Sequence, residues 1–259
     1  MLKKIFLSSI KRKGIVNTVL SFIVTSVLIA RFLRGDYWSV FLCVLTLLLF
    51  NIPVLVKRWF KVELSKELEV IILLFIFCAE ILGEIGSFYT HIPWWDTMLH
   101  TTNGFLMGAI GFALIDILNK SPNFHISLSP VFVAVVALCI SMTVGVAWEF
   151  FEFGMDTFFK TDMQKDRTVS YISSVALNPD GINNPIIAED IAKTILFDKD
   201  GKEIAIIENG YLDIGIIDTM KDLFVNFIGA AVFSVIGYFY LLGRDKVNVA
   251  KRFIPKLIS

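Results

Sequence analysis

The sequence predicts an all-α polytopic membrane protein, a bundle of about six transmembrane helices with a small, partly β-hairpin extracytoplasmic insert between the fifth and sixth. Hydrophobic residues make up 56% of the 259-residue chain. The mean hydropathy of +0.71 is too high for the surface of an ordinary soluble protein. Six apolar segments also approach the roughly 20 residues that a helix needs to cross the hydrocarbon core of a bilayer. The chain is therefore expected to have a lipid bilayer as its solvent.

The six expected spans are joined by connectors that are mostly short. They cover residues 15–33, 37–56, 68–86, 94–118, 128–156 and 218–243. The first could be a signal peptide, but it is long and ends in Ala30-Arg31-Phe32 without a small-residue cleavage site, so we expect it to be retained. Residues 1–156 and 218–259 then form the bundle, and residues 157–217 form an extracytoplasmic cap or loop.

Basic residues predict how the bundle is oriented. Lysine and arginine concentrate in the amino-terminal segment, the second loop and the carboxyl-terminal tail, which six spans place on one side: Lys3, Lys4, Lys11, Arg12 and Lys13; Lys57, Arg58, Lys61 and Lys66; Arg244, Lys246, Lys251, Arg252 and Lys256. The first loop, on the other side, has only Arg31 and Arg34, and the third loop has neither residue type. Because short cytoplasmic loops carry the excess of basic residues, we expect both termini in the cytoplasm.

The long connector, residues 157–217, contains two turn signals. They are Asn178-Pro179-Asp180-Gly181 and Asp198-Lys199-Asp200-Gly201. The second lies between Thr194–Phe197 and Glu203–Ile207, two runs rich in β-forming residues, and therefore predicts a hairpin. The alternative is a disordered connector, because loops of this length are often disordered unless they are functional.

Composition excludes several partners and enzyme classes. Lys plus Arg equal Asp plus Glu at 24 each, so the chain lacks the basic surface that a nucleic-acid partner requires. Three cysteines stand singly in apolar runs, which supports neither a disulfide framework nor a thiolate zinc site. The signatures of the readily named membrane phosphatases, alcohol phosphotransferases and serine hydrolases are not found.

Trp94 and Trp95 are typical of an aromatic belt at the bilayer surface. Gly104, Gly108 and Gly111 indicate close helix packing.

Acidic residues and one histidine recur in four of the expected helices. They are Glu80 and Glu84; Asp96 and His100; Glu149, Glu152 and Asp156; and Asp218 and Asp222. Within each set the spacing is three or four residues, which puts the members on one face of a helix. The third and fifth helices run outward and carry their acids at their ends, whereas the fourth and sixth run inward and carry theirs at their starts. All four sets are therefore expected in the outer leaflet.

So many carboxylates at membrane depth need protons, metal ions or a cationic ligand. Each ionisable group there costs about 2.5 to 3.5 kcal/mol on insertion scales, and the eight carboxylates have only Lys221 nearby in sequence. Carboxylates with one imidazole suit a divalent cation of unknown identity such as Mg, Mn, Fe or Zn. We expect one or two ions, with these ligands: Asp96, His100, Glu149, Glu152, Asp218 and Asp222. Glu80, Glu84 and Asp156 are more distant or alternative ligands, and Asn103 and Asn226 are candidate supporting residues. The alternative is that acids such as Asp96 and Asp218 only stabilise helix N-termini.

These residues also carry a resemblance to a known family. Its marks are Trp95-Asp96 with His100, the pair Glu149 and Glu152, and Asp218-Thr219-Met220-Lys221-Asp222 followed by Asn226, Gly229 and Ala230. In these residues the chain resembles the YjdF-like family of uncharacterised bacterial inner-membrane proteins, over the third to sixth helices. The resemblance implies the fold and a bacterial plasma (inner) membrane, but it implies no reaction. The long segment between Glu152 and Asp218 departs from the pattern of that family.

Three functions from different classes remain open at this point. In the first, one or two metal ions activate water or a hydroxyl against a lipid or envelope precursor. In the second, the carboxylates belong to a cation- or proton-coupled transporter, although no inverted repeat is evident. In the third, a non-catalytic membrane module holds a structural ion and its cap recruits a protein partner. The sequence assigns no catalytic residue and identifies no protein partner.

Overall fold

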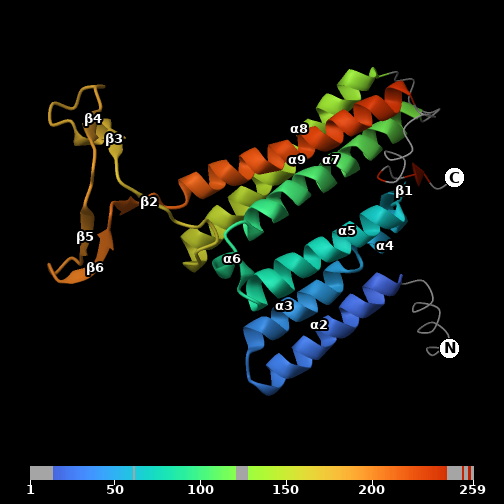
Figure 1. The fold of residues 1–259 in the computed structure, drawn as a ribbon, viewed down its shortest axis with the longest axis horizontal. Coiled ribbons are helices and arrows are strands. Elements are labelled where there is room, and N and C mark those ends of the chain that lie inside the picture. The colour runs from blue at the N-terminus through green and yellow to red at the C-terminus, as the bar shows by residue number, and fades with distance from the viewer. Residues whose placement is uncertain (1–13, 61, 121–127, 244–252, 254–255, 258–259) are drawn as a thin grey trace. The chain divides into compact units, whose positions relative to one another are not determined.

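The computed structural model describes residues 14–60, 62–120, 128–243, 253 and 256–257, and it is drawn in Figure 1. The chain forms two compact units, one made of Met1–Gly145 with Phe224–Ser259 and the other of Val146–Leu223. The basic amino-terminal segment, Lys61 and the arginines of the carboxyl-terminal tail lie outside the described residues. The orientation of the bundle therefore stays a prediction.

Five described helices are long and apolar enough to cross a membrane, and they confirm a polytopic helical membrane protein. They cover Ile15–Leu33, Tyr37–Trp59, Trp95–Asn119, Pro130–Phe159 and Ile216–Leu242. In Figure 1 the first is α2 (Ile15–Leu33), and the second is α3 (Tyr37–Leu49) with α4 (Ile52–Phe60). The others are α7 (Trp95–Lys120), α8 (Pro130–Gly154) with the π-helix Met155–Phe159, and α9 (Ile216–Leu242). They correspond to the first, second, fourth, fifth and sixth expected spans.

The third expected span, residues 68–86, consists of an α-helix followed by a π-helix. The helix α5 (Lys66–Ile76) has 11 residues, and a π-helix of 9 residues, Phe77–Ile85, follows it directly. In a π-helix each N–H bonds five residues back instead of four, a rare arrangement that is frequently found at functional sites. The sequence does not reveal this change, because the same residue types occur in both kinds of helix. Glu80 and Glu84 lie in the π-helical part.

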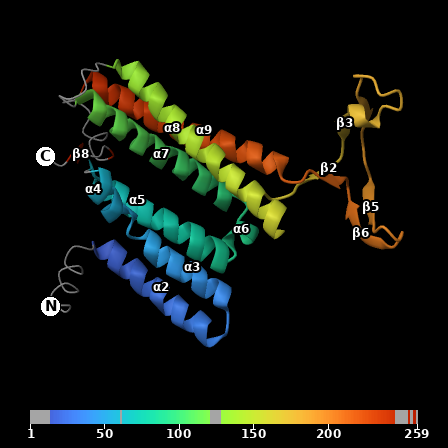
Figure 2. The same cartoon turned by 180° about the vertical axis from the view of Figure 1, so that it is seen from behind.

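One arginine joins three of these elements. The Arg31 guanidinium, in the last turn of α2, donates to the Asp36 carboxylate at 3.1 Å and to the Ile85 carbonyl at 3.4 Å. Asp36 also caps α3, since it accepts from the Ser39 amide at 3.1 Å. The end of α2, the start of α3 and the end of the π-helix are thereby linked, and Figures 1 and 2 show α2, α3 and α5 side by side.

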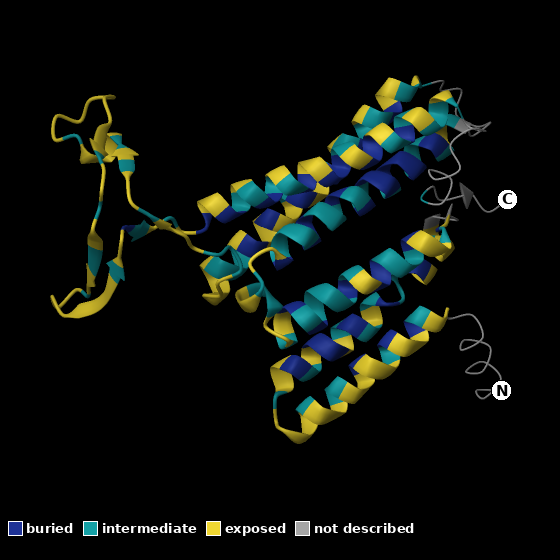
Figure 3. Cartoon of the chain, viewed as in Figure 1, coloured by how far each residue is buried: buried dark blue, intermediate teal, exposed yellow. Residues whose placement is uncertain are grey.

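Glycines bring α7, α8 and α9 into backbone contact, as the glycine pattern of α7 predicted. A Cβ on Gly104 would collide with the Asn226 carbonyl, and a Cβ on Gly229 would collide with the Thr101 carbonyl. A Cβ on Gly111 would lie 3.0 Å from Ile140 on α8. Figure 3 shows buried residues on the faces that these helices turn toward one another. At such distances the side chain of any larger residue would force the helices apart.

The second unit contains antiparallel strand pairs, all within the fully described stretch 146–223. Strand β2 (Thr168–Val169) pairs with β7 (Tyr211–Leu212), β3 (Ile172–Ser174) with β4 (Ile186–Ala188), and β5 (Lys193–Phe197) with β6 (Glu203–Glu208). The β5–β6 pair confirms the predicted hairpin. Its turn is closed by Asp198, whose carboxylate accepts from the Asp200 and Lys202 amides at 2.9 and 2.8 Å.

Short elements complete the described chain. They are β1 (Val62–Glu63), which pairs with β8 (Lys256–Leu257), α6 (Phe88–His91) and a 3-10 helix at Val175–Leu177. The expectation that Trp95 belongs to an aromatic belt is wrong. Trp94 is exposed, but Trp95 is buried and packs edge-on against Phe88 with ring centroids 4.8 Å apart. Trp95 is thus a packing residue rather than a membrane-surface anchor.

Candidate metal centre

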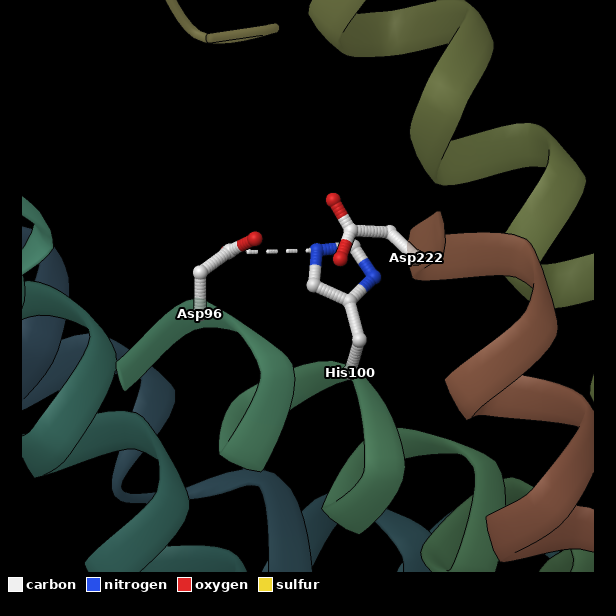
Figure 4. A group of neighbouring side chains, drawn as sticks. All are labelled: Asp96, His100 and Asp222. Carbon is white, nitrogen blue, oxygen red and sulfur yellow. Dashed lines mark ion pairs between the residues drawn. The ribbon is translucent and has the colours of Figure 1, made fainter. Parts of the chain in front are cut away.

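The first two turns of α7 place a carboxylate beside an imidazole. Asp96 and His100 are four residues apart, and the His100 Nε2 lies 3.4 Å from the Asp96 Oδ1, as Figure 4 shows. His100 is buried, whereas Asp96 retains some exposure. The carboxylate is therefore placed to orient the ring.

His100 belongs to two groups of side chains that could hold a metal ion. In the first group, ligand atoms of Asp96, His100 and Asp222 all lie within 4.8 Å of one another, and these residues are drawn in Figure 4. In the second, ligand atoms of His100, Glu149 and Glu152 meet the same limit, and all three residues are buried. Two ligands of one Zn or Mg ion at about 2.1 Å each are at most about 4.2 Å apart. Three ligands of one ion lie closer still, about 3.0 to 3.6 Å from one another, so the side chains of each group would have to draw together on binding.

A buried asparagine fixes the helices next to these groups. The Asn226 side chain on α9 is fully buried, accepts from Asn103 Nδ2 at 3.0 Å and donates to the Ser141 carbonyl at 3.4 Å. The Ser141 hydroxyl donates in turn to the Gly104 carbonyl at 2.8 Å. Three helices therefore share one hydrogen-bond network, which we call the Asn226 network (Asn103, Gly104, Ser141 and Asn226). His100 and Asp222 precede Asn103 and Asn226 by about one turn on unbroken helices.

Asp218, also predicted as a ligand, lies in neither group, and basic side chains surround it. Its Oδ2 accepts from the Lys165 amide at 3.0 Å. Its Oδ1 lies 3.6 Å from the Arg167 guanidinium and 3.7 Å from the Lys221 ammonium. Arg167 was missed by sequence reasoning, because only folding of the loop brings it to α9. A lone basic residue in a polar loop carries no signal of such a contact.

The three alternative ligands also lie outside both groups. Glu80 is half-buried and Glu84 is exposed on the π-helix that follows α5. The Asp156 carboxylate accepts from the Thr161 hydroxyl at 2.7 Å and from the Met163 and Gln164 amides at 2.7 and 2.8 Å. Asp156 thus closes the turn after α8.

A further buried acid was missed by sequence reasoning. Asp116 lies near the end of α7 and is only 3% exposed. The sequence could have indicated it, since Asp116 is a lone acid within an apolar run of a spanning helix. It lies outside the two groups around His100.

Asp213 fixes the junction between the loop and α9. Its carboxylate accepts from the Arg167 and Ile217 amides at 2.7 and 2.8 Å, and from the Gly215 amide at 3.3 Å. Burial raises the pKa of Asp213, but these backbone hydrogen bonds outweigh burial and hold the pKa below its ordinary value. The ionised carboxylate therefore caps α9 and positions the Arg167 backbone.

Comparison with known proteins agrees with this architecture. A family described as predicted membrane protein (DUF2238) matches residues 15–243, from the first spanning helix to the end of the last. The chain belongs to this family. Because the YjdF-like proteins are also DUF2238 members, the resemblance seen in the sequence is confirmed. Neither the curated proteins nor the solved structures gave a match.

Proposed function

We propose that this DUF2238 protein is a membrane enzyme that holds one or two divalent cations at His100 and acts on a lipid or envelope precursor. The supporting observation is the shared position of His100 in two groups of ligand atoms. An imidazole with several carboxylates suits a borderline or hard divalent cation. Asp96, His100 and Asp222 would hold one ion, and Glu149 with Glu152 would serve either the same ion or a second one.

The side chains present fit such an ion electrostatically. Four carboxylates and one imidazole gather in a spanning bundle, where Lys221 lies 3.5 Å from the Asp222 Oδ1, and a divalent cation would further offset the repulsion among the carboxylates. A bound divalent ion supplies a water of lowered pKa, about 7 for zinc. Glu149 and Glu152 are both buried. They are suited to accept a proton from a nucleophile, and the Asn226 network holds the helices that carry the ligands.

The proposed setting is a bacterial inner membrane with both termini in the cytoplasm. Lys57 and Arg58, in the last turn of α4, support the cytoplasmic side for the loop between α4 and α5. On this orientation the segment 157–217 is outside, and the groups around His100 lie in the outer leaflet. A substrate from the outer leaflet or the envelope would then lie on the same side of the membrane as these groups.

Elemental analysis of protein purified without chelators tests the proposal. Wild-type protein should contain stoichiometric metal, and His100→Gln and Asp222→Asn should contain much less. Asp116→Asn is the matched control, because it removes a buried acid from α7 outside both groups. Metal-free wild-type protein that stays folded and active after exhaustive chelation would disprove the proposal.

A further inference from the structure

Strand β6 is an open edge of a two-stranded sheet. It pairs only with β5, and no third strand pairs with either of them among the residues that the structure describes. Every residue of β6 except Ile207 is exposed, and Figure 3 shows the hairpin standing largely exposed. Isolated two-stranded hairpins are only marginally stable in water. An additional strand along β6 would therefore stabilise the hairpin.

The register of the hairpin shows which backbone groups face this edge. The Asn209 amide donates to the Ala192 carbonyl at 2.8 Å, and the Asp198 amide donates to the Lys202 carbonyl at 2.9 Å. In an antiparallel pair, residues that exchange hydrogen bonds alternate with residues whose N–H and C=O point away from the partner strand. In this register the outward backbone groups of β6 are those of Glu203, Ile206 and Glu208. They form a row of donors and acceptors that a further strand can use.

Apolar side chains are exposed on both faces of the hairpin. Leu196 lies on one face and is 43% exposed, whereas Phe197 and Ile206 lie on the other and are 59% and 45% exposed. Ile204, at the register shift, is 65% exposed. An antiparallel sheet usually packs one face on a core and turns a polar face to water. Contact with another polypeptide would remove this apolar surface from water.

The charges at the two ends of β6 indicate which polypeptide fits. The strand begins with Glu203 and ends with Glu208, and neither carboxylate forms an ion pair with a described residue. If two copies of β6 paired antiparallel in full register, Glu203 of each copy would lie opposite Glu208 of the other. Like charges directly opposite one another are destabilising. A second copy therefore fits poorly, and a strand with basic residues at these positions fits well.

The charge of the whole strand-forming segment points the same way. Residues 168–212 contain seven acidic and three basic side chains. Lys193 stands opposite Glu208 in the register but forms no ion pair with it. An acidic surface attracts a basic partner and repels another copy of itself.

We propose that the β6 edge binds an extended, basic segment of a partner protein, which adds a third strand to the hairpin. In such strand addition, main-chain hydrogen bonds supply affinity and alternate side chains supply specificity. The segment would place lysine or arginine opposite Glu203 and Glu208 and apolar residues between them. The partner lies on the same side of the membrane as residues 157–217. The inference does not depend on an ion at His100.

Selection from a library of random displayed peptides on the full chain in phosphatidylcholine nanodiscs tests the edge. Enriched peptides should have apolar residues between two basic ones, and a synthetic copy of the most enriched peptide should bind saturably. Ile206→Pro should weaken its binding about tenfold or more, because proline removes an outward N–H without removing a bond to β5. Ile195→Pro is the matched control, since Ile195 lies opposite Ile206 and its N–H points to the other edge. Binding to this control should equal that of the wild type.

Charge reversal tests the same edge without changing the backbone. A variant with both Glu203→Lys and Glu208→Lys should bind the selected peptide at least tenfold more weakly. It should instead bind a version of the peptide in which glutamate replaces the basic residues. Both positions are exposed, so this variant decides the matter if Ile206→Pro disrupts the hairpin.

Three outcomes would overturn the inference. The first is a selection that enriches no peptide, or only peptides without basic residues. The second is binding of the selected peptide that neither Ile206→Pro nor the charge reversal weakens. The third is efficient disulfide cross-linking between Ile206→Cys copies in liposomes, in a background without the three native cysteines, because a second copy would then occupy the edge.

Discussion

The Asn103 side chain on α7 donates to the Asn226 side chain on α9 at 3.0 Å. These residues are 123 positions apart, and each follows a candidate ligand, His100 or Asp222, by three or four residues. The hydrogen bond therefore sets the relative register of the two helices at the level of the ligands. Sideways or axial displacement of α9 would break it and would move Asp222 away from His100.

Replacing Asn226 should lower both stability and metal content. Asn226→Leu removes the hydrogen bonds of this side chain with Asn103, Ser141 and the Met142 sulfur. It leaves the Asn103 amide without its acceptor, which costs about 1 to 3 kcal/mol. Thermal unfolding in detergent and elemental analysis measure the two effects. Asn51→Ala is the control, because Asn51 donates only to carbonyls of its own turn, at 3.0 and 3.1 Å. If the two variants have the same unfolding temperature and the same metal content, Asn226 does not hold the ligand-bearing helices in place.

Adding one methyl group to Gly104 should separate α7 from α9. The new Cβ would collide with the Asn226 carbonyl, and overpacking of this kind costs about 1 to 3 kcal/mol or more. The matched control is Gly154→Ala, since nothing lies within 4 Å of a Cβ at Gly154. Unfolding midpoints of the two variants check the prediction, which fails if Gly104→Ala is as stable as Gly154→Ala.

Asp96 and Asp222 should be energetically coupled if they share an ion. A double-mutant cycle with Asp96→Asn and Asp222→Asn should give a coupling free energy of about 0.5 to 3 kcal/mol in the presence of metal. Chelation should reduce this coupling, because the shared partner is removed. If the losses of stability from the two substitutions add up both with metal and after chelation, the two acids act as independent helix-stabilising groups.

The junction at Asp213 should open in acid. The folded-state pKa of Asp213 is lowered, so its contribution to stability is present above the unfolded pKa of about 3.9. That contribution is lost as the pH falls through the folded pKa, below about 4. Pepsin cleavage near residues 164–167 should accelerate over this range in the wild type. In the Asp213→Asn variant, pepsin cleavage should already be fast at about pH 4. If the variant is instead cleaved there as slowly as the wild type, Asp213 does not cap α9.

Labelling from the two sides of the membrane tests the orientation. In a background without Cys43, Cys78 and Cys139, Asp180→Cys should react with an impermeant thiol reagent added to intact spheroplasts. Lys57→Cys should react only after permeabilisation. The reverse pattern would invert the orientation and would place the groups around His100 in the inner leaflet.

The sequence predicts the helices well because their length and polarity are imposed by the bilayer. The first span, 15–33, agrees with α2 at both ends, and the expected hairpin agrees with β5 and β6 because its turn residues are specific. The π-helix at Phe77–Ile85 was not predictable, since the same residue types occur in both kinds of helix.

The composition of the candidate site was predictable only in part. Helical spacing and common depth indicated that Asp96, His100, Glu149, Glu152 and Asp222 would meet. Asp218 and Asp156 have the same spacing, but loop amides and Arg167 contact them instead. Those contacts depend on how residues 157–217 fold, which no periodicity of the spanning helices encodes.

The contact between α7 and α9 also constrains how the protein is made. During synthesis α7 enters the bilayer before α9 leaves the ribosome. In that interval the Asn103 side chain lacks the hydrogen bond to Asn226 that it makes in the finished protein. Water, lipid headgroups or insertion machinery must solvate that amide during the delay. Arrival of α9 then completes the bundle and the surroundings of His100 in one late step, so a chain truncated before α9 would have the first helices but no assembled centre.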